Sequence, residues 1–447
     1  MKEFFKKNYI KLILVSIIIF SFIMNIILSF SIIPIRSTYD DFQHFYDMYR
    51  WYEKKSLPLT STRFELSDTY KEEFITPRVP GGDYYIFYIL CYKLGNENVY
   101  TAKIINYFFS LFIISLFLFW LYKKLGLFVC SFMSPLILLN GYLVKAMTNF
   151  WNPNISLIFS FIFFILLYEY IDKKSSKKTV ISSIFIFPVL AVAAQGHFAS
   201  FFSVVPTMIF YLIITYKNTI KYLKYWILGV FLSFLEYLPY LISEINNGFY
   251  NTKLMFLKGS DTGRIIIAKI QALFFFPTNE MSSHYLKGFN NIIGFWISSP
   301  SYIYGLIFLI LNLVFSFYCL INMFYFVFNL RYKGKTDNEN IFLEISKFFI
   351  LSIFITLLCF FIFKFGEGYF HYFYGLFAVC YAPIILFFVQ KENFIINTKK
   401  IFFGLSIFLV LNAAAMFGSI ERYVVKFEKD LSVIHNKNIE LFLNEHK

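Results

Sequence analysis

Long apolar runs, separated by short polar turns, occur along almost the whole chain of 447 residues. A helix needs about 20 apolar residues to cross a bilayer, so each run predicts one membrane-spanning helix. The pattern therefore predicts an all-α polytopic membrane protein, a bundle of about eleven transmembrane helices. The predicted spans are residues 10–33, 99–122, 125–142, 155–171, 180–194, 198–216, 222–242, 302–330, 348–363, 370–388 and 401–417.

Two shorter segments lie in the polar stretch that follows the first span, residues 34–98. Residues 42–55 alternate aromatic and polar side chains, which is typical of an amphipathic helix lying on a bilayer surface. Residues 84–94 are apolar but too few to cross. We predict that the first is an interfacial helix and that the second is interfacial or re-entrant.

Basic residues predict how the chain is oriented. They gather in every second turn between the apolar runs, in phase with the basic N-terminus, and the positive-inside rule places all of these turns in the cytoplasm. The first run is too long for a signal peptide and lacks a small-residue cleavage site, so we expect an uncleaved span. The clusters are Lys123 and Lys124; Lys173, Lys174, Lys177 and Lys178; Lys217, Lys221 and Lys224; Arg331, Lys333 and Lys335; and Lys391, Lys399 and Lys400.

This orientation leaves short turns inside and longer segments outside. We expect one multi-span domain, residues 1–418, with outer loops 34–98 and 243–301, followed by a short outer tail, residues 419–447. Function is accordingly expected on the outer side of the membrane.

Composition supports the membrane assignment and excludes other classes. The chain is 58% hydrophobic, 23% aromatic and only 15% charged, a balance that soluble domains of this length do not show. Its net charge of +14 sits in the short turns, which cannot build the contiguous basic face that nucleic-acid binding needs. The five cysteines have no CxxC spacing, so we interpret them as buried small apolar residues.

An acidic pair, Asp40 and Asp41, follows the first span directly and is the candidate catalytic site. Adjacent carboxylates at a membrane boundary shift each other's titration, and one of them can act as a general base beside a cation. A solvated loop pair or a helix N-cap would explain the pair equally well. Asp40 and His44 are one helical turn apart, but two ligands are too few for a metal site, so the sequence supports no metal.

Further candidates for substrate binding lie at the predicted outer ends of spans. Arg78 precedes a Pro80-Gly81-Gly82 turn that could bring backbone N–H groups close to a phosphate, although an ordinary helix start explains this turn as well. Ionisable residues at membrane depth are functional candidates in general. The candidates of this kind are Lys145, His197 and His371.

The predicted topology also limits which kind of activated donor the protein can use. The cytoplasmic turns have no room for a nucleotide-binding domain, and no P-loop or GxGxxG precedes a helix. An outward-facing enzyme beside a bilayer would instead take its activated group from a lipid, such as a polyprenyl-phosphate sugar. A carboxylate would accept the proton of the acceptor hydroxyl while cations hold the departing phosphate.

The order of these features resembles the GT-C superfamily of membrane glycosyltransferases, in particular family 39-like bacterial proteins related to protein O-mannosyltransferases and aminoarabinose transferases. The resemblance covers residues 1–206 best, including AAQGHFASFF (193–202), and is weaker at YLPYLISEINNGFYNT (237–252) and at His371. It implies a plasma-membrane glycosyltransferase whose catalytic carboxylate is Asp40 or Asp41, with Arg78, Lys145 and Arg264 as the phosphate-binding candidates. The implied partners are a polyprenyl-phosphate sugar, a glycan, lipid or protein acceptor, and membrane lipids.

Two other functions fit the same pattern. An O-antigen-type polysaccharide polymerase also has many spans and a large outer loop in its later half, as residues 243–301 could form. A lipid or solute transporter or flippase would need charged residues near the middle of several spans, whereas most candidates here lie at outer ends.

Overall fold

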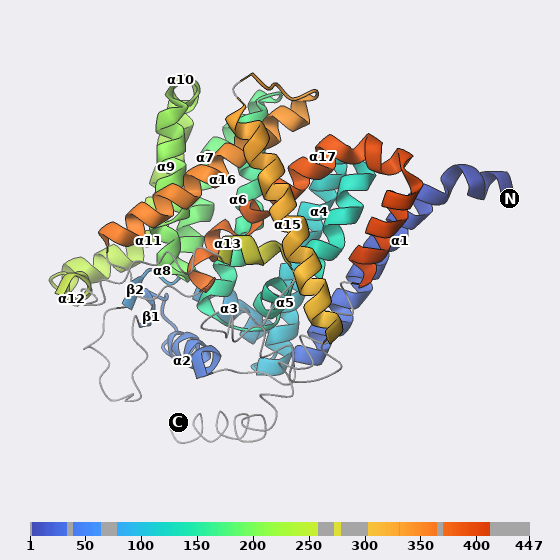
Figure 1. Cartoon of the computed structure of the whole chain (residues 1–447). Helices are drawn as coiled ribbons and strands as arrows, with labels where there is room; N and C mark the ends of the chain where they lie inside the picture. The colour runs from blue at the N-terminus through green and yellow to red at the C-terminus, as the bar shows by residue number, and fades with distance from the viewer. Residues whose placement is uncertain are drawn as a thin grey trace.

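The structure, a computed structural model, describes residues 2–33, 39–63, 78–257, 272–278, 303–329, 331–363 and 370–411. Among these residues helices make up nearly the whole fold, and a short two-stranded sheet lies at one end (Figure 1). Eight helices in this part of the chain are long and apolar enough to cross a membrane. The protein is therefore an all-α polytopic membrane protein, as predicted, while the number of about eleven spans remains a prediction.

The long apolar helices correspond closely to the predicted spans. They are α1 (Lys2–Ile32), α4 (Val99–Leu138), α6 (Asn152–Asp172), α7 (Ser176–Gly196), α11 (Leu223–Asn246), α15 (Ile303–Phe328), α16 (Asp337–Ile362) and α17 (Ala382–Asn397). Shorter elements connect them: α8 (Phe198–Phe201), α9 (Val204–Ile214), α10 (Tyr216–Thr219), η1 (Ile220–Tyr222), α13 (Ala272–Phe275), η3 (Phe276–Thr278) and η7 (Ala378–Tyr381). Residues 399–411 are also helical, and the remainder of the predicted span 401–417 lies outside the described residues.

Helix α4 covers two predicted spans because it folds back on itself at Gly126. This glycine has a φ of 86°, which breaks the helix and which other residues adopt only at an energetic cost. The Cys130 thiol then donates to the Leu118 carbonyl at 3.3 Å, whereas 12 residues of straight helix would span about 18 Å. The Asn25 side chain of α1 bonds both arms, through the Tyr107 hydroxyl and the Leu138 carbonyl.

The basic turns meet at one end of the bundle, which we call the basic end. Lys124, after the first arm of α4, pairs with Glu169 and Asp172 of α6, each at 3.0 Å. Lys174, in the next basic turn, pairs with Asp337 of α16 at 2.9 Å. The in-phase arrangement of these basic turns was predicted from the sequence.

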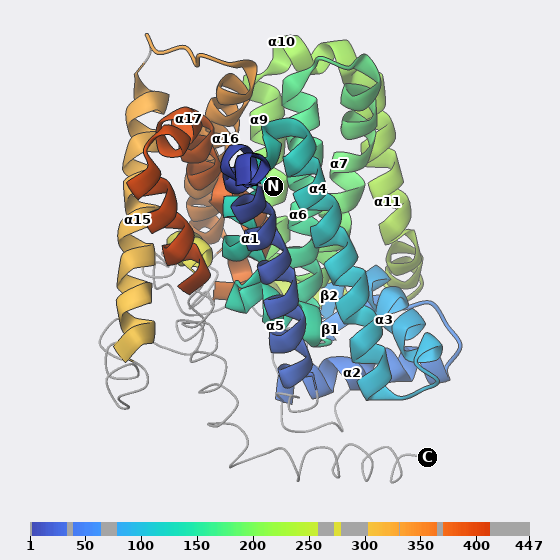
Figure 2. The ribbon, with the colours of Figure 1, turned by 90° about the vertical axis from the view of Figure 1, so that its right-hand side faces the viewer.

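The opposite end, which we call the polar end, carries the shorter elements (Figure 2). They are α2 (Tyr39–Glu53), β1 (Thr60–Arg63), β2 (Arg78–Pro80), α3 (Asp83–Leu94), α5 (Gly141–Thr148), α12 (Tyr250–Leu257) and η6 (Phe370–Leu376). Strands β1 and β2 pair antiparallel and were not predicted. The helices predicted at residues 42–55 and 84–94 are present as α2 and α3, and their interfacial position remains a prediction.

The predicted span 370–388 differs from the structure. Residues 370–381 form the 3-10 helices η6 and η7, and the regular helix α17 begins only at Ala382. Pro383 explains this start, because proline lacks an N–H group and fits the first turn of a helix. An apolar run does not distinguish a 3-10 turn from a regular helix, so the sequence pattern placed the start too early.

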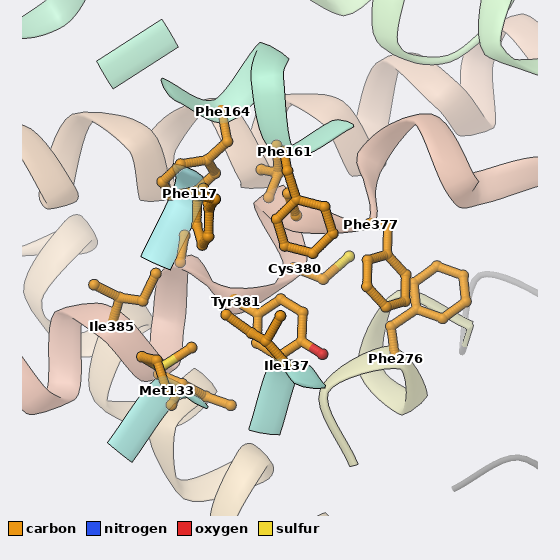
Figure 3. Close-up of a cluster of buried hydrophobic side chains, with 14 of the residues drawn as sticks. Phe117, Met133, Ile137, Phe161, Phe164, Phe276, Phe377, Cys380, Tyr381 and Ile385 are labelled. Atoms are coloured by element: carbon orange, nitrogen blue, oxygen red, sulfur yellow. The ribbon is translucent and has the colours of Figure 1, made fainter. Parts of the chain in front are cut away.

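Aromatic side chains fill the centre of the bundle (Figure 3). The Phe117 and Phe161 rings meet edge to face with centroids 5.0 Å apart, and the Phe276 and Phe377 rings are also 5.0 Å apart. The buried Tyr381 hydroxyl donates to the Leu136 carbonyl at 3.0 Å, which satisfies its polar group. This packing accounts for the high aromatic content and fixes α4, α6 and η7 relative to one another.

Candidate functional site

A cavity of about 520 Å³ lies at the polar end between α2, the β1–β2 sheet, α11 and α12. Its lining residues come from segments that are far apart in the sequence, 47–60, 78 and 243–254. Charged and amide side chains line it together with aromatic ones, among them Asp47, Arg50, Trp51, Lys54, Arg78 and Asn251. This composition suits a ligand with an anionic group and hydroxyl groups.

Arg78 ties the elements around the cavity together. Its backbone N–H donates to the Asn251 side chain at 2.7 Å, and its carbonyl accepts from the same amide at 2.9 Å. Its guanidinium contacts the Asp47 carboxylate and the Ser61 carbonyl, each at 3.3 Å. One residue therefore joins α2, the sheet and α12, and its charged group borders the cavity.

The charges around the cavity leave it positive. Asp47 is neutralised by Arg78. Glu244 accepts from the backbone N–H groups of Asn251 and Thr252 and from the Thr252 hydroxyl, so this carboxylate serves to cap the start of α12. Arg50 and Lys54 add two further positive charges to the lining. The cavity accordingly favours an anion.

His44 is a buried side chain of α2, and the nearby tyrosines Tyr84 and Tyr85 are buried as well. Its Nδ1 atom is 3.2 Å from the Tyr85 hydroxyl, and the neighbouring Tyr84 hydroxyl is 2.6 Å from the Ser61 hydroxyl. Burial, together with the nearby His197 and Arg78, lowers the pKa of His44 to about 3. The imidazole is therefore neutral at physiological pH.

We expect His44 to make the protein less stable in acid. Its pKa is about 3 when folded and about 6.5 when unfolded, so the unfolded chain binds more protons as the pH falls through this window. Between pH 7 and pH 5 the loss is about 2 kcal/mol. Thermal unfolding in detergent should show a smaller acid-induced drop in Tm for His44→Gln than for the wild type. Equal drops in both proteins would contradict this expectation.

A second group of side chains lies deeper at the polar end. The Lys145 ammonium is 4.3 Å from the centre of the Trp151 ring, and the Trp151 and His371 rings are 4.7 Å apart. The His197 and His371 rings are 4.9 Å apart. Three predicted binding residues, Lys145, His197 and His371, are thus brought together from α5, the α7–α8 junction and η6.

The turn after β2 contacts Gln195, which lies in the last turn of α7, two residues before His197. The Gln195 side chain accepts from the Asp83 backbone N–H at 2.9 Å. Gly81 has a φ of 80°, and a Cβ atom there would lie 2.4 Å from the same side chain. The predicted tight turn at residues 80–82 is therefore present, and its glycine is required both by its backbone conformation and by the close approach of Gln195.

The acidic pair lies in the first turn of α2, because that helix begins at Tyr39. The side chains of Asp40 and Asp41 lie outside the described residues, and so does Arg264. By the helical repeat, position 40 is on the same face of α2 as His44 and Asp47, which follow it by four and seven residues.

Sequence reasoning missed several residues of the cavity, among them Arg50, Lys54 and Asn251. Arg50 follows Asp47 by three residues on a predicted amphipathic helix, so the helical repeat could have indicated that it shares a face with Asp47. Asn251 is 173 residues from its partner Arg78, and no local pattern signals such a contact.

In comparisons with known proteins, no family model, no curated protein and no solved structure matches the chain. Within the described part of the chain, no three His, Cys, Asp or Glu side chains gather as metal ligands.

Proposed function

We propose that this protein is a membrane glycosyltransferase of GT-C type that transfers a sugar from a polyprenyl-phosphate donor to an acceptor outside the membrane. One observation carries the proposal: the cavity at the polar end combines net positive charge with a position at the end of a membrane-spanning bundle. A lipid-linked phosphate sugar needs both a cationic site for its phosphate and access from the bilayer.

Exposed apolar side chains next to the cavity support access from the bilayer. Ile245 and Phe249 flank the lining residues of α11 and α12 and are 61% and 47% exposed, and Leu57 on the other side is 61% exposed. Exposed apolar side chains of this size at a membrane boundary are compatible with contact to a lipid tail.

The orientation of the chain is part of the proposal. The basic turns share one end of the bundle, and the positive-inside rule assigns that end to the cytoplasm. The cavity at the polar end then faces the outside, where nucleotide sugars are absent and lipid-linked sugars serve as donors.

In the proposed reaction the acceptor hydroxyl oxygen attacks the anomeric carbon of the donor. The bond between that carbon and the phosphate oxygen breaks, and the lipid phosphate leaves with the bonding electron pair. Asp40 or Asp41 accepts the proton of the hydroxyl as general base. Arg78, Arg50 and Lys54 stabilise the negative charge that develops on the leaving phosphate.

The distribution of buried charge favours an enzyme over a transporter. Glu236, near the middle of α11, is partly buried, with its Oε2 atom shielded from solvent. In the long helices, the fully buried charged side chains of the described residues lie within about two turns of a helix end. They are Lys103, Glu169, Glu244 and Glu339. A translocation pathway would require such groups near the middle of the bundle.

Mass analysis of lipid-linked sugars and surface glycans tests the proposed function. Cells lacking the protein are expected to accumulate one polyprenyl-phosphate sugar and to lose one sugar from an envelope glycan, lipid or protein. Wild-type protein should reverse both changes. Shortened glycan chains without accumulated donor would indicate a polymerase instead, and unchanged lipids and glycans would refute the proposal.

A further inference from the structure

A second, apolar groove lies far from the polar-end cavity, on the membrane-facing side of α9 and α11. It has a volume of about 470 Å³ and runs along α9, α10, η1 and the first turns of α11, with Phe187 of α7 behind it. Its lining is apolar apart from Tyr216 and Thr219. The groove thus offers space for a hydrocarbon chain at the basic end of the bundle.

Specific contacts build the floor and the closed end of this groove. The Trp226 ring packs edge to face against Tyr170 and Phe187, with centroids 5.1 and 5.6 Å apart. The Thr219 hydroxyl donates to the Leu212 carbonyl at 2.9 Å and lies 3.3 Å from the Tyr170 hydroxyl. These contacts hold α9 and α11 apart at a fixed separation below α10.

Three lysines lie next to lining residues in the sequence, where the groove runs along α10, η1 and the start of α11. Lys217, Lys221 and Lys224 alternate in the sequence with the lining residues Tyr216, Ile220 and Leu223. Within the part of the chain that the structure describes, these three lysines form no ion pair.

Lys173, from the turn between α6 and α7, adds a further positive charge at this end. Partial burial lowers the pKa of Lys173, the Lys221 ammonium lowers it further, and the Glu344 carboxylate raises it.

We propose that this groove binds an anionic glycerophospholipid, with one acyl chain along α9 and α11 and the phosphate beside the lysines of α10, η1 and α11. Lipids of the bilayer surround this surface. Clusters of lysine at the end of a transmembrane helix attract acidic headgroups. The charge of the lysines complements an anionic headgroup, whereas a zwitterionic one gains little. The inference is independent of the chemistry at the polar-end cavity.

Native mass spectrometry of the purified full-length protein, titrated with phosphatidylglycerol or phosphatidylcholine, tests this site. Wild-type protein should retain phosphatidylglycerol at least about tenfold more strongly than phosphatidylcholine. The triple variant Lys217→Gln, Lys221→Gln, Lys224→Gln should lose most of this preference, because juxtamembrane lysines each contribute several-fold to the binding of acidic lipid. Lys399→Gln with Lys400→Gln is the charge control: these lysines begin the helix 399–411, which lies across the bundle from α11 (Figure 1).

A matched pair of tryptophan variants tests the apolar half of the site. Ile213→Trp should fill the groove and reduce phosphatidylglycerol binding about tenfold, because Ile213 lines it. Ile214→Trp places the same side chain at an exposed position outside the lining and should leave binding unchanged. Equal binding of the two lipids by wild-type protein, or equal loss in both tryptophan variants, would overturn the proposal.

Discussion

Sugar transfer by the Asp40→Asn variant is expected to fall by about two to four orders of magnitude, which is the usual contribution of a general base. An amide cannot accept the proton of the acceptor hydroxyl, while its size and shape match those of the carboxyl group. The protein should therefore still insert and fold. The expected readout is accumulation of the lipid-linked donor in cells that carry only the variant, together with lost transfer in membranes from those cells.

Variants of the neighbouring Asp41 and of Glu53, at the other end of α2, provide the comparison. Asp41→Asn and the double variant identify which member of the pair is the base, and at least one single variant should be inactive. Glu53→Gln is the control, because Glu53 ends the same helix and bonds the exposed Tyr49 hydroxyl at 2.7 Å. Full transfer in both single variants and in the double variant would rule out the pair as the catalytic group.

Much of the fold could be predicted because its physical causes are local. A span is recognised by a run of about 20 apolar residues, and the lysines that predict its orientation lie in the turns next to it. Gly81 also acts locally, since its positive φ bends the chain in the predicted turn, whereas the turn between the two arms of α4 was predicted from Lys123 and Lys124 and not from Gly126. These signals predicted the helices, the turn at residues 80–82 and the gathering of basic turns at one end.

The parts that could not be predicted depend on contacts between distant segments. The β1–β2 sheet is joined to α12 by hydrogen bonds between Arg78 and Asn251, which are 173 residues apart. Neither strand has the alternating pattern of a strand in a larger sheet. The 3-10 turns of η6 and η7 are apolar like a span, so their conformation follows from packing rather than from composition.

The candidate site was predicted in part for the same reason. Lys145, His197 and His371 were recognised one by one as polar residues at span ends, and the fold brings them together. Arg78 was recognised from its turn, but its pairing with Asp47 required the folded sheet. Local chemistry therefore indicated which residues to consider, and tertiary structure placed Arg78 in the cavity lining and Lys145, His197 and His371 in a separate group.

Replacing Lys124 is expected to have the largest effect on stability. Its ammonium lies 3.0 Å from both the Glu169 and the Asp172 carboxylates, which are only 9% and 7% exposed. Lys124→Met would leave the nearly buried Asp172 carboxylate without this cation, and Glu169 would keep only the more distant Lys178, 3.5 Å away. Removing one partner from a buried ion pair costs several kcal/mol, and we expect about 2–3 kcal/mol here because the Lys124 ammonium is itself 19% exposed.

Thermal unfolding in detergent measures this loss as a lower Tm, and two comparisons assign it to the buried charges. Lys347→Met breaks an exposed pair with Glu344, so it should cost less than about 1 kcal/mol. Adding Glu169→Gln and Asp172→Asn to Lys124→Met should recover part of the lost stability, because no uncompensated carboxylate then remains at the basic end. If Lys124→Met and Lys347→Met lowered Tm equally, the buried ion pairs would not be what holds α4 to α6.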